Sequence, residues 1–154
     1  MVKLHSPLDQ VDTTYPLYGI GSRTVDKNGN EYIYLPGTTS VAAYDFVTYK
    51  TASGLSYGSV TRMVKGTAGQ VAIAQGAATG PKYGWFQIYG VGWGNCGAVT
   101  SSGSPLYASG TTATVTTTVA STQLIYGTLC VGSGISGGTA KIFLNYPFFP
   151  TQTL

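Results

Sequence analysis

Short runs of β-branched and aromatic residues, separated by turns rich in glycine and proline, extend through this 154-residue chain. About ten such runs recur at intervals of roughly 8–12 residues, a pattern typical of all-β sandwiches and barrels. A long helix would need many strong helix formers, yet the chain contains a single glutamate, Glu31. We therefore predict an all-β fold, a single compact β-barrel or sandwich of about ten short strands.

The clearest local element is a hairpin. The pair Asn28-Gly29 separates two β-rich runs, residues 20–25 and 31–35. An Asn-Gly pair in this setting favours a type I′ turn, in which both central residues adopt positive φ. Residues 1–18 show little periodicity, and we predict an extended N-terminal arm there, ordered against a partner. The β-barrel domain would then span residues 19–154.

Further strands are predicted by periodicity at 45–49, 59–64, 70–74, 82–91, 98–100, 111–119, 123–131 and 140–146. In the third of these, Val71 and Ile73 share one face. Ala72 and Ala74 share the other face, where their small size indicates a close approach of another element.

Four expectations concern the burial of these segments. Residues 82–91 and 123–131 are apolar on both faces and should be central. In 111–119, Val115, Thr117 and Val119 should share a buried face, with Thr114, Thr116 and Thr118 on the solvated one. In the last strand Ile142 and Leu144 should point inward. Residues 101–105 are expected to form a turn.

The charges divide the chain into two parts. All acidic residues lie within the first 45 positions, as Asp9, Asp12, Asp26, Glu31 and Asp45. The remainder carries scattered cations, Lys50, Arg62, Lys65, Lys82 and Lys141, and no acid or histidine. A nucleic-acid module clusters its cations with aromatics on one face, so we predict no nucleic-acid partner. No apolar run approaches the roughly 20 residues of a membrane span, and residues 1–7 lack the apolar core of a signal peptide.

Motif matches to catalytic sites lack the partners that catalysis needs. Ser56 and Ser136 stand in G-x-S-x-G patterns, but a nucleophile elbow needs an acid and a histidine downstream. Residues 132–137 match G-x-G-x-x-G, yet a strand rather than a helix is expected after them. Glu31 and Asp45 are the one strand-borne carboxylate pair for a glycosidase. We predict no catalytic residue, no cofactor and no metal site.

Two residue pairs allow more than one interpretation. Trp85 and Trp93 would fill a core or a subunit interface, or would stack against a carbohydrate. Cys96 and Cys130 fit no zinc or redox spacing, and are either buried thiols or a disulfide.

The order of features from Gly19 onward resembles a known family. The hairpin at 19–35 is followed by a small-residue strand at 69–75 and then by a Gly-Trp-Phe strand at 83–90, with a Ser-rich turn at 101–107. This order resembles the small β-barrel head-decoration (cement) proteins of tailed bacteriophages. The resemblance implies a virion structural protein, made in the bacterial cytoplasm, that binds the outside of an assembled capsid. It also implies the major capsid protein as partner, and a homotrimer.

Aromatic residues beside prolines gather near both chain ends, where a monomer would struggle to bury them. We expect capsid or subunit contacts from Tyr15, Pro16, Leu17, Tyr18, Tyr146, Phe148 and Phe149. The opposing interpretation is that each end packs on its own barrel. The alternative function is a carbohydrate- or receptor-binding β module of a phage tail or fibre, with Trp85 and Trp93 exposed in a groove.

Overall fold

A computed structural model describes residues 8, 15–38, 40–50, 57–78, 82–98, 101–118, 123–132 and 138–150. Within these ranges the chain forms ten strands: β1 (Arg23–Val25), β2 (Glu31–Pro36), β3 (Phe46–Tyr49), β4 (Thr61–Arg62), β5 (Gly69–Ala74), β6 (Tyr83–Ala98), β7 (Pro105–Ala108), β8 (Val115–Thr116), β9 (Leu124–Cys130) and β10 (Thr139–Phe149). The all-β prediction is confirmed. The described ranges contain no helix long and apolar enough to cross a membrane.

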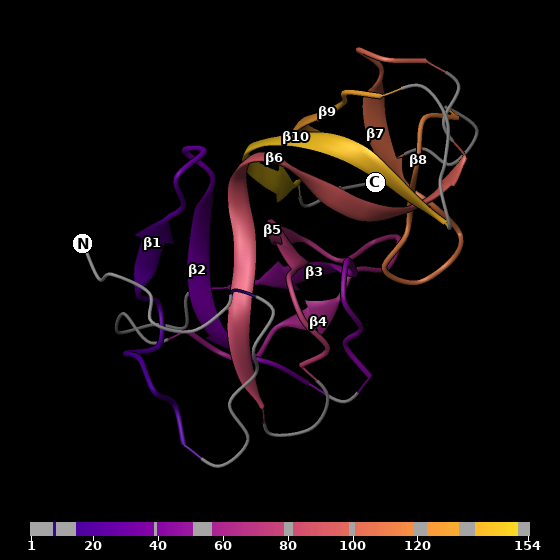
Figure 1. Cartoon of the computed structure of the whole chain (residues 1–154). Coiled ribbons are helices and arrows are strands. Elements are labelled where there is room, and N and C mark those ends of the chain that lie inside the picture. The colour runs from indigo at the N-terminus through magenta and orange to yellow at the C-terminus, as the bar shows by residue number, and fades with distance from the viewer. Residues whose placement is uncertain are drawn as a thin grey trace.

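Six strands close into a barrel, in the order β6, β8, β7, β9, β10, β5 and back to β6. Strand β6 is 16 residues long, so it also extends beyond the barrel, where its first half pairs with β2. Figure 1 shows β6 passing from the β1–β2 hairpin to the region beneath β10. At its middle, Gly90 has φ +93°, and a Cβ there would collide with Oδ1 of Asn30. Glycine is therefore required at this point of β6.

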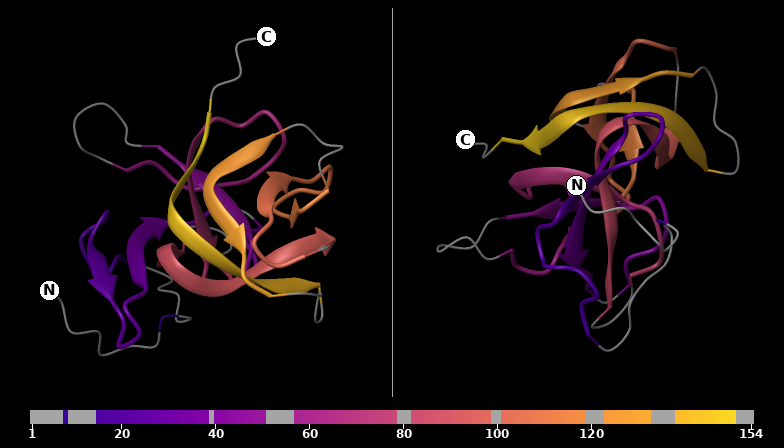
Figure 2. Two further views of the ribbon diagram at one scale, coloured as in Figure 1. Left: turned by 90° about the horizontal axis from the view of Figure 1, so that it is seen from above. Right: turned by 60° about the vertical axis from the view of Figure 1, so that its left-hand side comes forward.

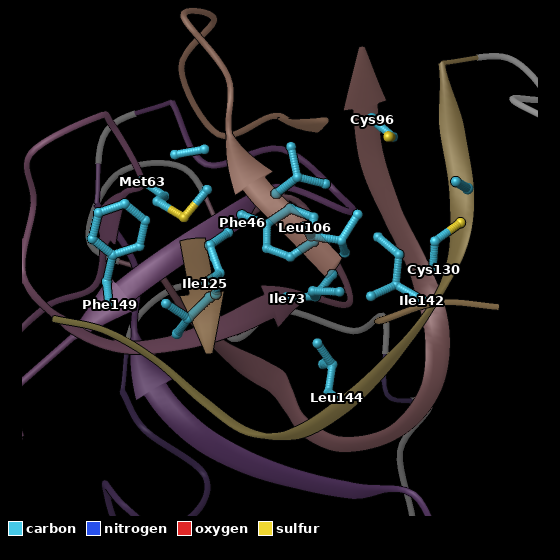
Figure 3. Close-up of a cluster of buried hydrophobic side chains, with 14 residues drawn as sticks. Phe46, Met63, Ile73, Cys96, Leu106, Ile125, Cys130, Ile142, Leu144 and Phe149 are labelled. Atoms are coloured by element: carbon cyan, nitrogen blue, oxygen red, sulfur yellow. The ribbon is translucent and has the colours of Figure 1, made fainter. Parts of the chain in front are cut away.

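Strands β3 and β5 separate two hydrophobic cores. Val71 and Ile73 point into the barrel core, drawn in Figure 3, which also contains Phe46. Ala72 and Ala74 point the other way, into a second core between β3–β5 and β2–β6. The predicted alternation along β5 is confirmed, and the fold combines a barrel with a small sandwich because both faces of these strands are covered.

The predicted hairpin is confirmed, but its predicted turn type is wrong. Gly29 has φ +81°, whereas Asn28 does not adopt positive φ. The Gly29 N–H donates to the Asp26 carbonyl (3.1 Å) and the Asp26 N–H to the Asn30 carbonyl (2.9 Å), the pattern of a type I turn with a glycine bulge. The Asp26 carboxylate favours this turn because it accepts bonds from the Asn28 and Asn30 N–H groups at 2.8 and 3.0 Å.

The second half of the chain confirms some expectations and corrects others. Residues 84–88 of β6 are buried on both faces, and Ile142 and Leu144 point inward, as predicted. The predicted turn extends only to Ser104, since β7 begins at Pro105. Within 111–119 only β8 forms, and its Thr116 is buried, because β8 pairs with β6 on one edge and with β7 on the other.

The prediction that 123–131 is buried on both faces is wrong. In β9, Ile125, Thr128 and Cys130 face the barrel interior, whereas Tyr126 and Leu129 are exposed. A barrel wall has one interior face, and no described residue covers the outer face of β9.

Candidate assembly surface

The outer faces of β9, β10 and the second half of β6 form one continuous surface. Strand pairing places Val91, Phe143 and Leu129 in one row across the three strands. Figure 2 shows β9 and β10 side by side above β6. We call this surface the apolar sheet face; its members are Tyr89, Val91, Trp93, Tyr126, Leu129, Val131, Phe143, Tyr146 and Phe148.

The apolar sheet face is open in a single chain. Val91, Trp93, Tyr126, Leu129, Val131, Tyr146 and Phe148 are each 42–48% exposed. The side chains between them on β10, Ile142 and Leu144, are fully buried. Contiguous apolar patches of this kind mark interaction surfaces, because a monomer gains nothing by keeping them in water.

Ring contacts hold the aromatic members in place. Tyr126 and Phe148 stack with ring centroids 5.1 Å apart and planes 10° from parallel. Tyr89 stacks on Tyr146 at 5.3 Å and meets Phe143 edge-on at 5.9 Å. Side chains that are already ordered lose less conformational entropy when a partner binds, so this face is preorganised for contact.

Charge is nearly absent from this surface. Across the described strands β6, β9 and β10, Lys141 is the one charged residue. Its Nζ atom lies 5.6 Å from the centroid of the Trp93 ring, within the range of a cation–π contact. These three strands therefore offer apolar area together with a single positive charge.

A bulge in β10 brings Tyr146 and Phe148 onto this surface. The register with β9 shifts between Leu144 and Phe148, and Tyr146 adopts φ 45°. The shift reverses the alternation, so Leu144 points inward while Tyr146 and Phe148 point outward. The Tyr146 hydroxyl donates to the Glu31 carboxylate, and this bond raises the pKa of Tyr146.

The N-terminal arm is anchored at a different place. Tyr18 packs on Tyr34 and Trp85, with ring centroids 5.3 and 5.2 Å apart. Leu8 packs against the same aromatic cluster. Leu8 and Tyr18 therefore pack on the chain itself, and the need of the arm as a whole for a partner stays a prediction. The rest of 1–14 lies outside the described residues.

The sequence-predicted contact residues fall into two groups. Tyr15, Pro16 and Leu17 are exposed, Tyr146 and Phe148 belong to the apolar sheet face, and Tyr18 is partly covered. Phe149 is 3% exposed and lies in the barrel core near Met63 (Figure 3). Trp85 is 2% exposed, so Trp85 and Trp93 do not share an open groove.

The remaining members of the apolar sheet face were missed because their exposure depends on which strands flank them. Val91, Leu129 and Val131 look like core residues in the sequence. The signal in the sequence is the apolar character of 123–131 on both faces, which by itself predicts burial on both faces.

The carboxylates that were considered for catalysis are both engaged. Asp45 is buried and paired with Arg62, whereas Glu31 accepts the Tyr146 bond at the rim of the apolar sheet face. Ser56 and Ser136 lie outside the described residues. The residues after the 132–137 glycines form β10, not the helix that a dinucleotide site needs. In the described ranges no three His, Cys, Asp or Glu side chains gather as metal ligands.

The cysteines are free and buried. The Cys96 thiol donates to the Ala98 carbonyl at 3.4 Å and the Cys130 thiol to the Gly132 carbonyl at 2.9 Å. Burial raises the pKa of Cys96 to about 11. The interpretation as buried thiols, rather than as a disulfide, matches this arrangement.

Comparisons with known proteins give a match at the level of fold. No protein-family model and no curated protein sequence matches the chain. Among solved structures it is similar to the head fiber gp8.5 N base in bacteriophage phi29, with a TM-score of 0.53 and 13% sequence identity. The match covers 76% of this chain and 95% of that one. At this identity the likeness shows a shared fold.

Proposed function

We propose that this chain is a structural protein of a bacteriophage virion, bound to the outside of the assembled capsid as a decoration protein. The observation that carries the proposal is the apolar sheet face, seven of whose side chains are 42–48% exposed. An apolar surface of this kind suits a protein that works inside an assembly. The shared fold with a head-fiber base and the sequence resemblance to capsid cement proteins support the same role.

The mechanism would be stabilisation by mass action. A protein that binds the assembled lattice of major capsid protein, and not the free subunits, lowers the free energy of the assembled shell. Each additional bound copy adds to this effect. The partners are then the major capsid protein and further copies of this chain, in a homotrimer.

The fold match also supports a second role, as the capsid-bound base of a fibre. The two roles differ in what projects from the capsid. Electron microscopy of labelled particles would show compact knobs for a decoration protein and elongated projections for a fibre base.

The proposed function is tested by co-sedimentation with purified heads of the phage that encodes the chain. We expect the chain to pellet with expanded heads and to remain in solution with unexpanded ones. Leu129→Asp should weaken this binding at least tenfold, because it places a charge within the surface through which the chain assembles. Val64→Asp is the matched control, since Val64 is similarly exposed (41% against 44%) but lies outside that face. Failure to bind any head would overturn the proposal.

A further inference from the structure

We propose that the apolar sheet face binds the Tyr15–Leu17 segment of a second copy of this chain, so that copies join head to tail. This inference rests on the proposed role of that face as an assembly surface. It names the occupant of the face, which the proposed function leaves open.

The Tyr15–Leu17 segment has the form of an apolar ligand. Tyr15 and Leu17 are 77% and 65% exposed, the two highest values among the large apolar side chains described. Pro16 keeps Tyr15 out of the helical region. Pro16 also lacks an N–H, so this segment is better suited to docking by side chains than to pairing with a strand edge.

The segment is held away from its own sheet face. The Leu17 N–H donates to the Tyr34 hydroxyl at 3.2 Å, and Tyr18 packs on Trp85. Trp85 lies in the first half of β6, which pairs with β2, whereas the apolar sheet face uses β6 from Tyr89 onward. Figure 1 shows that β6 bends, so that its two halves run in different directions. The high exposure of Tyr15 and Leu17 confirms that neither side chain is covered by its own barrel.

Charge complementarity favours the arm as the occupant. Asp9 and Asp12 precede Tyr15 in the sequence, and no cation stands between Lys3 and Arg23. The sheet face presents Lys141 and no carboxylate on its three described strands, while Glu31 of β2 lies at its rim and is engaged by Tyr146. If two sheet faces met each other instead, both partners would contribute a lysine and neither an acid from these strands. The arm of a second copy supplies a carboxylate for Lys141.

The contact joins two different patches, so it is heterologous. Such contacts close into rings when the rotation between copies divides a full turn, and a ring leaves no exposed arm or face. One interaction would therefore cover both the exposed Tyr15–Leu17 segment and the apolar sheet face.

The inference is tested by photo-crosslinking of the purified full chain, without capsids. Leu17 is replaced by p-benzoylphenylalanine in ¹⁵N-labelled protein, which is mixed with unlabelled wild-type chain and irradiated. We expect mixed-isotope products with the crosslink on β9, β10 or the second half of β6. Crosslinks within one chain, crosslinks to other strands, or the absence of any crosslink would overturn the inference.

Mass measurement supplies a second, independent readout. The wild-type chain should elute as a multiple of its 16.0 kDa mass, and Leu17→Asp and Leu129→Asp should each shift it to the monomer. Val64→Asp should leave the mass unchanged. A charge-swapped pair, Lys141→Asp with Asp12→Lys, should restore assembly that Lys141→Asp alone weakens. Crosslinks as expected without capsid binding would refute the proposed function alone, whereas capsid binding by a wild-type monomer would refute this inference alone.

Discussion

The Nε atom of Arg62 lies 2.7 Å from Oδ2 of Asp45, the residue immediately before β3. The Nε–H is not aligned as a hydrogen bond, so this contact is an ion pair. The same carboxylate accepts bonds from the Ala42 N–H and from Nδ2 of Asn95, each at 2.9 Å. Because Arg62 belongs to β4 and Asn95 to β6, one buried carboxylate connects the sandwich to the barrel.

Replacing this carboxylate should be costly. Asp45 is 1% exposed, and removing one partner of a buried ion pair costs about 3–5 kcal/mol of unfolding free energy. We expect both Asp45→Ala and Arg62→Met to fall in this range. Asp45→Ala also removes the acceptor of the Ala42 and Asn95 bonds. Arg62→Met leaves the buried carboxylate without its cation. Guanidinium chloride denaturation measures both variants. A loss of less than about 1 kcal/mol for Asp45→Ala would contradict this role.

A methyl group at Gly94 should disrupt the barrel core. A Cβ there would lie 2.7 Å from the Phe46 ring and 2.9 Å from Cδ1 of Ile142. Overpacking of this kind costs about 1–3 kcal/mol, so we expect Gly94→Ala to lower the denaturation midpoint. Gly58→Ala is the control, since a Cβ at Gly58 meets no atom within 4 Å. Equal stability of the two variants would contradict the close packing at Gly94.

The turn carboxylate of Asp26 should make stability depend on pH. Burial by itself would raise the pKa of Asp26, but bonds from the Asn30 side chain and from the Asn30 and Asn28 N–H groups bring it below its ordinary 3.8. A lowered pKa in the folded state stabilises the fold above the unfolded pKa, and this contribution is lost as pH falls through the folded value. Wild type should therefore exceed Asp26→Ala in stability at neutral pH. The difference should shrink in denaturation curves measured as the pH falls below 3.8.

The two thiols should be unreactive in the folded chain. Burial raises the pKa of Cys96 to about 11, which leaves little thiolate at neutral pH. We expect Ellman's reagent to label neither cysteine in buffer and both in guanidinium chloride. Absence of labelling after unfolding would indicate a disulfide and would contradict the free thiols of the structure.

The two tryptophans should respond differently to a water-borne quencher. Trp93 is 42% exposed and Trp85 2%. Acrylamide should quench the emission of Trp85→Phe, in which Trp93 remains, much more strongly than that of Trp93→Phe. Equal and strong quenching of both variants would support the alternative prediction, a ligand groove in which both tryptophans are exposed.

Local chemistry made several features predictable from the sequence. The scarcity of helix formers, the glycine-rich turns and the period of two gave the all-β class and most strands. The two faces of β5 were predictable because Val71 and Ile73 alternate with alanines. Part of the candidate site was predictable too, since Tyr15, Leu17, Tyr146 and Phe148 are exposed as expected.

What the tertiary structure decided is which apolar faces are covered. Residues 84–88 and 124–130 are both apolar on both faces in the sequence, yet the first is doubly buried and the second is not. The difference arises because β6 lies against β2 and a second core, whereas β9 is a barrel wall with one interior side. Burial depends on strands that are distant in the chain, and periodicity reports only local geometry. The composition therefore determined an all-β fold with more apolar side chains than the single chain buries. The barrel topology placed the exposed ones on the outer face of β6, β9 and β10.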